Sequence, residues 1–247
     1  MTILNNFVKQ GNYLFRYRSY FPLILFILAV PFVSMSLKNL NITAFVNVID
    51  ALSVLICFFG FAIRCYAVGT TPKGTSGRNT KQQVAEQLNT TGIYSVVRHP
   101  LYLGNYLISL GIVIFTHSPM FILIFSLLFW IYYERIMAAE EDFIGNKFGD
   151  AFMNWAARTP AFLPSFKNST KGLVPFSIKT VLRREYSGFL STVISYTYID
   201  YLRLYLSDEN VLQVRVSLYV LAIATIITLL LRTLKHHTSV LFEKDRS

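Results

Sequence analysis

The residues with the clearest chemical potential are crowded into residues 92–104, which read GIYSVVRHPLYLG. A guanidinium and an imidazole, Arg98 and His99 (the cationic pair), stand immediately before Pro100 and a long apolar run. Proline is favoured at the first position of a helix, where free backbone amides attract anions. The stretch therefore predicts an anion-binding corner for a carboxylate or phosphate. On charge alone, a cationic anchor beside a membrane helix is an alternative interpretation.

Two acidic residues further along the chain, Glu140 and Glu141 (the glutamate pair), could face this corner. The apolar runs 101–118 and 120–133 are separated only by a short turn, so they should form an antiparallel hairpin. Its two ends would lie side by side, which brings the cationic pair close to the glutamate pair. The glutamates could instead solvate an interfacial helix, and the residues alone leave both interpretations open.

The composition places these motifs in a membrane. Hydrophobic residues make up 53% of the 247 residues and charged residues only 15%, unlike an ordinary soluble domain. A membrane crossing needs roughly 20 apolar residues. We expect an all-α integral membrane protein with about six transmembrane helices and a cofactor pocket at the cytoplasmic face. Five helices are possible, because Asp200 and Arg203 make the run 186–206 uncertain. The runs are 19–37, 44–68, 101–118, 120–133, 186–206 and 211–231.

The distribution of Lys and Arg predicts the orientation of these helices. Basic residues precede the first run, separate the second from the third, and recur at 135–184 and 232–246, whereas the other loops are nearly free of them. Positive loops face the cytoplasm, so both termini are expected there. The net charge of +10 follows one membrane face, which favours anionic lipid over nucleic acid as a partner.

Composition also divides the chain into three expected parts. Residues 1–68 form an N-terminal transmembrane helix pair, residues 69–164 a core of loop, hairpin and interfacial helix, and residues 165–247 a linker with a second helix pair. Arg64 lies near the cytoplasmic end of its apolar run, where it could snorkel to the surface or meet an anionic substrate.

These motifs closely resemble the isoprenylcysteine carboxyl methyltransferase and phospholipid methyltransferase superfamily. The resemblance rests on R-H-P-x-Y-x-G at 98–104, G-x-Y at 92–94, E-E at 140–141, F-G at 148–149 and P-x-F-x-P at 160–164. It implies S-adenosylmethionine bound at the cytoplasmic membrane face, without a metal. The implied cofactor-binding residues are Tyr94, Arg98, His99, Pro100, Tyr102, Gly104, Glu140 and Glu141.

A finer resemblance concerns the acceptor. The loop GTSGRNTKQQ at 74–83 and the apolar pair after the core look like a bacterial subgroup associated with methylation of the lipid A 1-phosphate. This implies a lipid phosphate acceptor and the bacterial inner membrane. Thr159-Pro160-Ala161 stands where Pro-Arg is frequent in the family, a departure that weakens the inference about the acceptor.

Methyl transfer from a sulfonium requires mainly alignment and a dry site. The cationic pair and the amides at the helix start are expected to hold the methionine carboxylate, and the glutamate pair the ribose hydroxyls or amino group. We expect catalytic roles for Arg98, Glu141 and Arg64. Arg64, Arg78 and Arg158 are candidates to bind the lipid phosphate.

Other activities remain open at this level. Within the superfamily, the alternative is a prenylcysteine-type carboxyl or a phospholipid amine methyltransferase. A nicotinamide-dependent membrane reductase can carry a similar Arg-His-Pro-x-Tyr-x-Gly segment, but a Glu commonly follows the glycine there, whereas Asn105 follows it here. A transporter or scaffold would use Asp50, Arg64 and Asp200 as pathway charges. The sequence gives no indication of the oligomeric state.

Overall fold

The computed structural model describes residues 2–18, 20–38, 45–75, 85–207, 210–244 and 246. Regular structure within these ranges is helical, apart from two isolated bridges that join Pro72 to Arg246 and Gly92 to Thr170. The elements are α1 (Ile3–Tyr17), α2 (Phe21–Lys38), α3 (Val46–Gly69), the 3-10 turn η1 (Ile93–Ser95), α4 (Pro100–Ile114), α5 (Pro119–Phe148), α6 (Asp150–Ala156), α7 (Ile178–Leu206) and α8 (Val216–His237).

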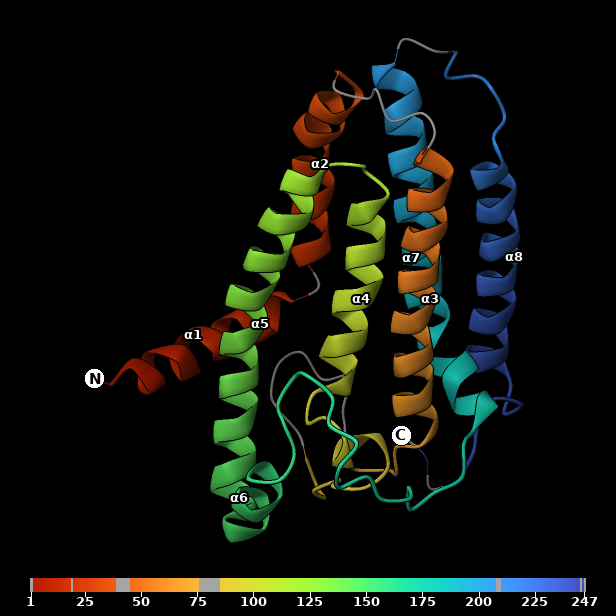
Figure 1. Ribbon diagram of the computed structural model, residues 1–247. Coiled ribbons are helices and arrows are strands. Elements are labelled where there is room, and N and C mark those ends of the chain that lie inside the picture. The colour runs from red at the N-terminus through yellow and green to blue at the C-terminus, as the bar shows by residue number, and fades with distance from the viewer. Residues whose placement is uncertain are drawn as a thin grey trace.

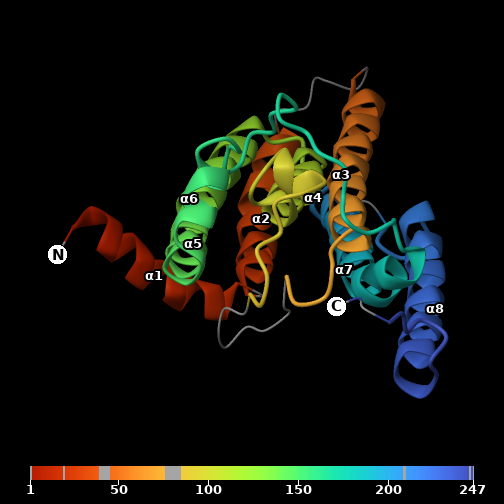
Figure 2. The same ribbon diagram turned by 90° about the horizontal axis from the view of Figure 1, so that it is seen from below.

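The long helices stand roughly upright in one bundle, and α1 crosses its flank at a steep angle (Figure 1). Seen from below, α4 lies in the middle of the bundle, with α5 on one side and α3 on the other (Figure 2). Helix α8 packs on the outer side of α7 (Figure 2). The starts of α4 and α7, the ends of α3 and α5, and the loops between them gather at the lower end (Figure 1). Motif residues distant in sequence therefore meet there.

The chain is an all-α membrane protein, as the sequence predicts. Within the described residues, α3, α5 and α8 are long and apolar enough to cross a membrane. The apolar part of α2 and the whole of α4 are shorter, and α7 is long but more polar. All six apolar runs are helical wherever the structure describes them, apart from a few residues at their ends. The number of helices that cross stays a prediction.

Helix α5 is longer than its apolar run predicts. Ser118 accepts a hydrogen bond from the amide of Phe121, and Pro119 occupies the first turn, so the start is well defined. Beyond the apolar run, good helix formers continue the helix to Phe148. It ends at Gly149, whose φ of +53° favours glycine. One continuous helix thus carries the glutamate pair to the lower end of the bundle.

Helix α1 is an amphipathic element that lies outside the predicted apolar runs, because it is too short and polar for a membrane crossing. Thr2 caps its start by accepting from the amide of Asn5. Its packing against α5 is close: a Cβ at Gly11 would lie 1.9 Å from the carbonyl oxygen of Arg135. Phe15 enters the core, and the chain then leads to Arg18 beside the cavity described below.

The core is built on an aromatic ridge along α5. Phe121, Phe125, Phe129 and Tyr133 recur every four residues on one helix face, and all are buried. The rings of Phe129 and Tyr133 stack with centroids 4.1 Å apart. Tyr106 of α4 packs against this ridge. These stacked rings make a rigid wall behind the lower end of the hairpin.

Helices α3 and α4 touch almost backbone to backbone. A Cβ at Gly60 would lie 2.7 Å from the carbonyl oxygen of Gly104, and one at Gly111 would lie 2.5 Å from that of Ser53. Small residues in membrane helices commonly permit such close approach. A Cβ at Gly104 would also lie 2.5 Å from Cγ of Arg64, so the arginine side chain crosses α4 at this glycine.

An ion cluster ties the helices together at the opposite end of the bundle. Asp50 of α3 lies 2.6 Å from Nε2 of His117 and 3.4 Å from Arg203 of α7. Arg203 also lies over the ring of Phe115. Asp50 thus has partners from other parts of the bundle. These contacts explain a charged residue in a membrane helix without the transport pathway of the transporter interpretation.

Candidate active site

A cavity of about 520 Å³ lies at the lower end of the bundle. Its volume is within the roughly 300–1,000 Å³ typical of small-molecule sites. Parts of α1, α3, α4, α5, α6, α7 and the loop before η1 contribute to its wall. Both members of the cationic pair and both of the glutamate pair line it, together with Tyr94, Pro100 and Tyr102.

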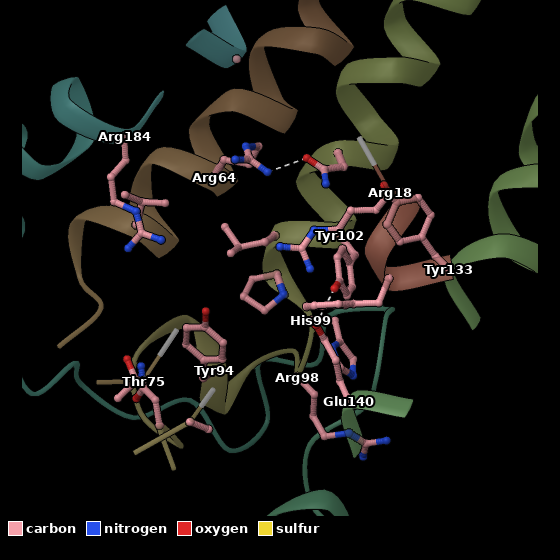
Figure 3. Close-up of a pocket in the computed structure, with 18 of the residues that line it drawn as sticks. Arg18, Arg64, Thr75, Tyr94, Arg98, His99, Tyr102, Tyr133, Glu140 and Arg184 are labelled. Atoms are coloured by element: carbon pink, nitrogen blue, oxygen red, sulfur yellow. Dashed lines mark hydrogen bonds and ion pairs between the residues drawn. The ribbon is translucent and has the colours of Figure 1, made fainter. Parts of the chain in front are cut away.

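The imidazole of His99 is held between two carboxylates. Its Nε2 lies 2.9 Å from Oε1 of Glu141, and its Nδ1 lies 3.5 Å from Oε2 of Glu140. The hydroxyl of Tyr102 donates to the other oxygen of Glu140 at 2.6 Å, and these side chains converge on one side of the cavity (Figure 3). The hairpin therefore brings together the cationic and glutamate pairs, as the sequence predicts.

The surroundings of His99 change its protonation. Burial disfavours the imidazolium, but the hydrogen bonds and negative charges of Glu140 and Glu141 outweigh it, so the pKa of His99 is raised above its usual 6.5. Burial raises the pKa of the Tyr94 phenol from 10.0, so that hydroxyl stays neutral. The cavity therefore combines an imidazole whose protonated form is favoured by two carboxylates with a neutral aromatic donor.

Arg98 is engaged by the protein itself. Its Nε and Nη2 donate to the two oxygens of Glu141 at 2.8 and 3.1 Å. Its Nη1 donates to the carbonyl oxygens of Ala156 and Thr159 at 2.8 and 2.7 Å. The side chain extends away from that of His99 (Figure 3). This geometry makes Arg98 a clamp that fixes one carboxylate and the end of α6.

The backbone amides before α4 also donate to groups of the protein itself. The amide of Arg98 donates to the carbonyl of Pro160 at 2.9 Å, and that of His99 donates to Ala161 at 3.1 Å. Pro100 has no amide proton. The amides of Arg98 and His99 are therefore satisfied by residues 160–161, which run alongside the motif. Anion binding by the first amides of α4 stays a prediction.

Aromatic side chains form much of the remaining wall. The ring of Tyr102 stacks on His99, with centroids 5.7 Å apart, and Tyr133 packs behind it at 4.9 Å. Across the cavity, the indole nitrogen of Trp155 donates to the carbonyl oxygen of Tyr94 at 2.9 Å, which fixes η1 against α6. Such faces suit an adenine ring or an organic cation.

Arg64 makes a pair that sequence reasoning missed. Its Nε and Nη2 donate to both oxygens of Glu185 at 2.8 and 2.9 Å, and Nη1 donates to the side chain of Asn105. Glu185 lies at the start of α7 and is 5% exposed. The available signal was an Arg-Glu pair, residues 184–185, directly before an apolar run. Nothing local in the sequence links that run to α3.

The other predicted site residues lie elsewhere. Gly104 sits in the contact between α3 and α4 and is not among the residues that line the cavity. Arg158 is exposed beyond α6, where its Nε donates to the carbonyl oxygen of Asn154, and it does not line the cavity either. Arg78 lies outside the described residues.

Comparison with known proteins assigns the part of the chain that builds this site. The model of the phospholipid methyltransferase family matches residues 48–151. The protein-S-isoprenylcysteine O-methyltransferase of Schizosaccharomyces pombe is 31% identical over 85 residues, which are 34% of this chain and 36% of that protein. Part of the chain, including residues 48–151, is thus similar to the isoprenylcysteine carboxyl methyltransferase and phospholipid methyltransferase superfamily.

Two further relatives show the extent of the match. The nickel-cobalt-cadmium resistance protein NccN of Alcaligenes xylosoxydans xylosoxydans is 36% identical over 89 residues, 36% of this chain and 39% of that protein. The rat protein-S-isoprenylcysteine O-methyltransferase is 27% identical over 131 residues, 51% of this chain and 44% of that protein. The chain thus spans less than half the length of these relatives. No solved structure shows a significant match.

Residues 48–151, called the superfamily segment below, contain nearly all of α3 and the whole of η1, α4 and α5, and they end just inside α6. It therefore supplies the cationic pair, the glutamate pair and Arg64. Helices α7 and α8 lie beyond it, although α7 supplies the partner of Arg64 and part of the cavity wall.

Proposed function

We propose that this protein is an S-adenosylmethionine-dependent methyltransferase of the membrane, acting on a lipid or lipidated acceptor. The observation that carries the proposal is the cluster of His99, Glu140 and Glu141 on the wall of a cavity, within the superfamily segment. The relatives named as O-methyltransferases support the reaction class. The distribution of basic residues supports a cavity at the cytoplasmic face, with both termini on that side. The resemblance of loop 74–83 to a bacterial subgroup supports a bacterial inner membrane.

The side chains of the cavity fit this cofactor. Carboxylate oxygens of the glutamate pair can accept from an ammonium group and from ribose hydroxyls. The faces of Tyr94 and Tyr102 suit an adenine ring and a sulfonium, which a π-face attracts as it does other cations. Arg18, whose side chain lies at the cavity wall, can pair with a carboxylate. Pro100 lines the cavity beside them.

When bound, S-adenosylmethionine supplies a methyl group already activated by a positive sulfur. The protein then has to align the two reactants and exclude water. Arg98 holds Glu141 with two hydrogen bonds, and Glu141 in turn orients His99, so Arg98 and Glu141 preorganise the site rather than transfer a proton. The aromatic ridge around Phe129 and Tyr133 keeps the inner wall dry.

The acceptor is the finer part of the proposal. An ionised oxygen needs no general base, because it is nucleophilic without losing a proton. Arg64 lines the cavity and is our candidate to hold such an oxygen during the reaction. The names of the relatives favour a prenylcysteine-type carboxylate. Methylation of a lipid phosphate, such as the lipid A 1-phosphate, rests on the resemblance of loop 74–83, most of which lies outside the described residues.

Labelled methyl transfer tests this function. Purified protein in detergent is incubated with methyl-labelled S-adenosylmethionine and a total membrane extract, and label should enter the lipid fraction. Mild alkali releases methanol from a carboxyl ester but not from a methyl phosphodiester, which separates the two acceptors. Glu141→Gln should abolish most transfer, whereas Glu134→Gln, on the same helix but away from the cavity, should not. Stabilisation by reduced nicotinamide and not by S-adenosylhomocysteine would instead support a reductase.

A further inference from the structure

One face of α7 lines the cavity, although this helix lies outside the superfamily segment. The residues of this face, called the α7 face below, recur at intervals of three and four, as expected for one side of a helix. Two of them, Gly188 and Ser191, are also exposed, so the cavity opens to the outside of the bundle along this stretch. The α7 face consists of Arg184, Glu185, Gly188, Ser191, Thr192 and Ser195.

The lower end of the α7 face is charged. A guanidinium carries five N–H donors, and Arg64 uses three of them on Glu185 and Asn105. Among the described residues, two donors of Arg64 thus remain for a ligand, on a side chain held in one orientation by a bidentate contact. Arg184 adds a second guanidinium on the cavity wall (Figure 3). This end suits an anionic oxygen.

The upper part of the α7 face consists of polar residues, but their hydroxyl donors are used within the helix and do not offer hydrogen bonds to a ligand. The hydroxyls of Ser191, Thr192 and Ser195 donate to the carbonyl oxygens four residues earlier in α7, at 2.9, 3.0 and 2.8 Å. Such back-bonded hydroxyls leave their donors satisfied within the helix. Small side chains with satisfied donors, facing Ile108 and Ile112 of α4, leave room for hydrocarbon.

A smaller cavity of about 40 Å³ extends this path. It shares Ser109, Ile112 and Ser195 with the main cavity, and the rest of its lining is apolar except for Thr116. The path thus runs from Arg64 and Arg184, along α4 and α7, towards the buried middle of the bundle.

Resting on the methyltransferase function proposed above, we propose that the α7 face is the acceptor site. It takes a molecule with one anionic head and one hydrocarbon chain, the head at Arg64 and Arg184 and the chain along Gly188, Ser191 and Ser195. Both a prenylated cysteine carboxylate and a lipid phosphate monoester have this chemistry. Glu185 acts as a positioning residue that aims Arg64.

The charge on the cavity wall agrees with such an acceptor. Four guanidinium groups line it against three carboxylates, leaving an excess of positive charge. In the reaction, the acceptor oxygen forms a bond to the methyl carbon while the carbon–sulfur bond breaks and its electron pair stays on sulfur. No proton needs to move. Because a carboxylate becomes neutral and a phosphate monoester loses one negative charge, methylation weakens the contact with Arg64 and favours release.

Filling the path tests the site without touching the cofactor end. In Ser191→Leu, the binding constant for S-adenosylhomocysteine should stay within about twofold of the parent. The KM for the acceptor should rise on the order of tenfold or more, as expected when a hydrocarbon path is blocked. Ser187→Leu is the matched control, since Ser187 is exposed on α7 and does not line the cavity. The probes are S-farnesyl cysteine and dioleoyl phosphatidic acid, each in mixed micelles.

The binding site for the anionic head is tested by replacing the ion pair of Arg64 and Glu185 with two neutral residues. Because Arg64→Gln alone would leave Glu185 buried without its partner, Arg64→Gln is combined with Glu185→Gln. Thermal stabilisation by S-adenosylhomocysteine shows that the variant is folded. Stabilisation by the anionic probe should fall on the order of tenfold in apparent affinity, the loss expected for charge-assisted hydrogen bonds. This second readout does not depend on turnover.

Each outcome decides the matter. The probe that the parent methylates, and for which the two variants show the changes in KM and apparent affinity given above, identifies the source of the anion. If the parent methylates a probe and both variants match it, the α7 site is wrong while the methyltransferase function stands. If the parent binds S-adenosylhomocysteine but neither binds nor methylates either probe, the anionic acceptor site is overturned. If S-adenosylhomocysteine does not bind the parent, both proposals fail.

Discussion

His99 is the residue on which the geometry of the site converges. Its two ring nitrogens face one carboxylate each, and Arg98 fixes one of those carboxylates from the far side. The sequence predicts this meeting, because a short turn forces the ends of the hairpin together. It does not predict the carbonyl partners of Arg98, since Ala156 and Thr159 reach it only through the bend at Gly149 that starts α6.

The raised pKa of His99 makes a pH-dependent prediction. Above pH 6.5 and below its folded-state pKa, the folded protein holds a proton that the unfolded chain has lost. The stabilisation is therefore complete below pH 6.5 and is lost as the pH rises through the folded-state pKa. The difference in melting temperature between the parent and His99→Gln should be largest at acid pH and shrink on the alkaline side. His236→Gln, in an exposed position, is the control. A difference that is constant with pH would contradict the assignment.

Among the helices, the contact between α3 and α4 positions Arg64 on the cavity wall. The family resemblance implies a cofactor role for Gly104, whereas the structure gives it a packing role against Gly60 and Arg64. A pattern of spaced glycines cannot distinguish these roles, because both require the absence of a side chain. The helices were predictable from the lengths of the apolar runs. Which helix packs against which was not predictable, because small residues such as glycine and serine do not identify the neighbouring helix.

The predicted effect of Gly104→Ala follows from this packing. The added Cβ would lie 2.5 Å from the arginine stem and 2.9 Å from the carbonyl oxygen of Gly60, so α3 and α4 must separate. Overpacking of this kind typically costs about 1–3 kcal/mol, measured as a lower thermal midpoint in detergent. Gly145→Ala is the matched control, because its Cβ would meet Phe152 at an ordinary 3.4 Å. Equal midpoints for the two variants would argue against the close contact.

Over the whole molecule, the site is assembled from parts that no single stretch of sequence contains. The superfamily segment supplies the cationic and glutamate pairs, while α1 brings Arg18 and α7 brings Glu185. The membrane class and the all-α fold follow from composition, because apolar runs of this length have few other stable solutions. The contribution of α1 and α7 to the cavity follows only from tertiary packing. In addition, α1 is too polar to be predicted as a helix from apolar length.

The central claim is that the lower cavity binds S-adenosylmethionine through the glutamate pair. It is tested most directly by titrating S-adenosylhomocysteine into the purified full-length protein and into the Glu140→Gln, Glu141→Gln double variant. The parent should bind, and the variant should lose on the order of tenfold or more in affinity, because two charge-assisted acceptors are removed. A parent that does not bind, or a variant that binds equally well, would contradict the account.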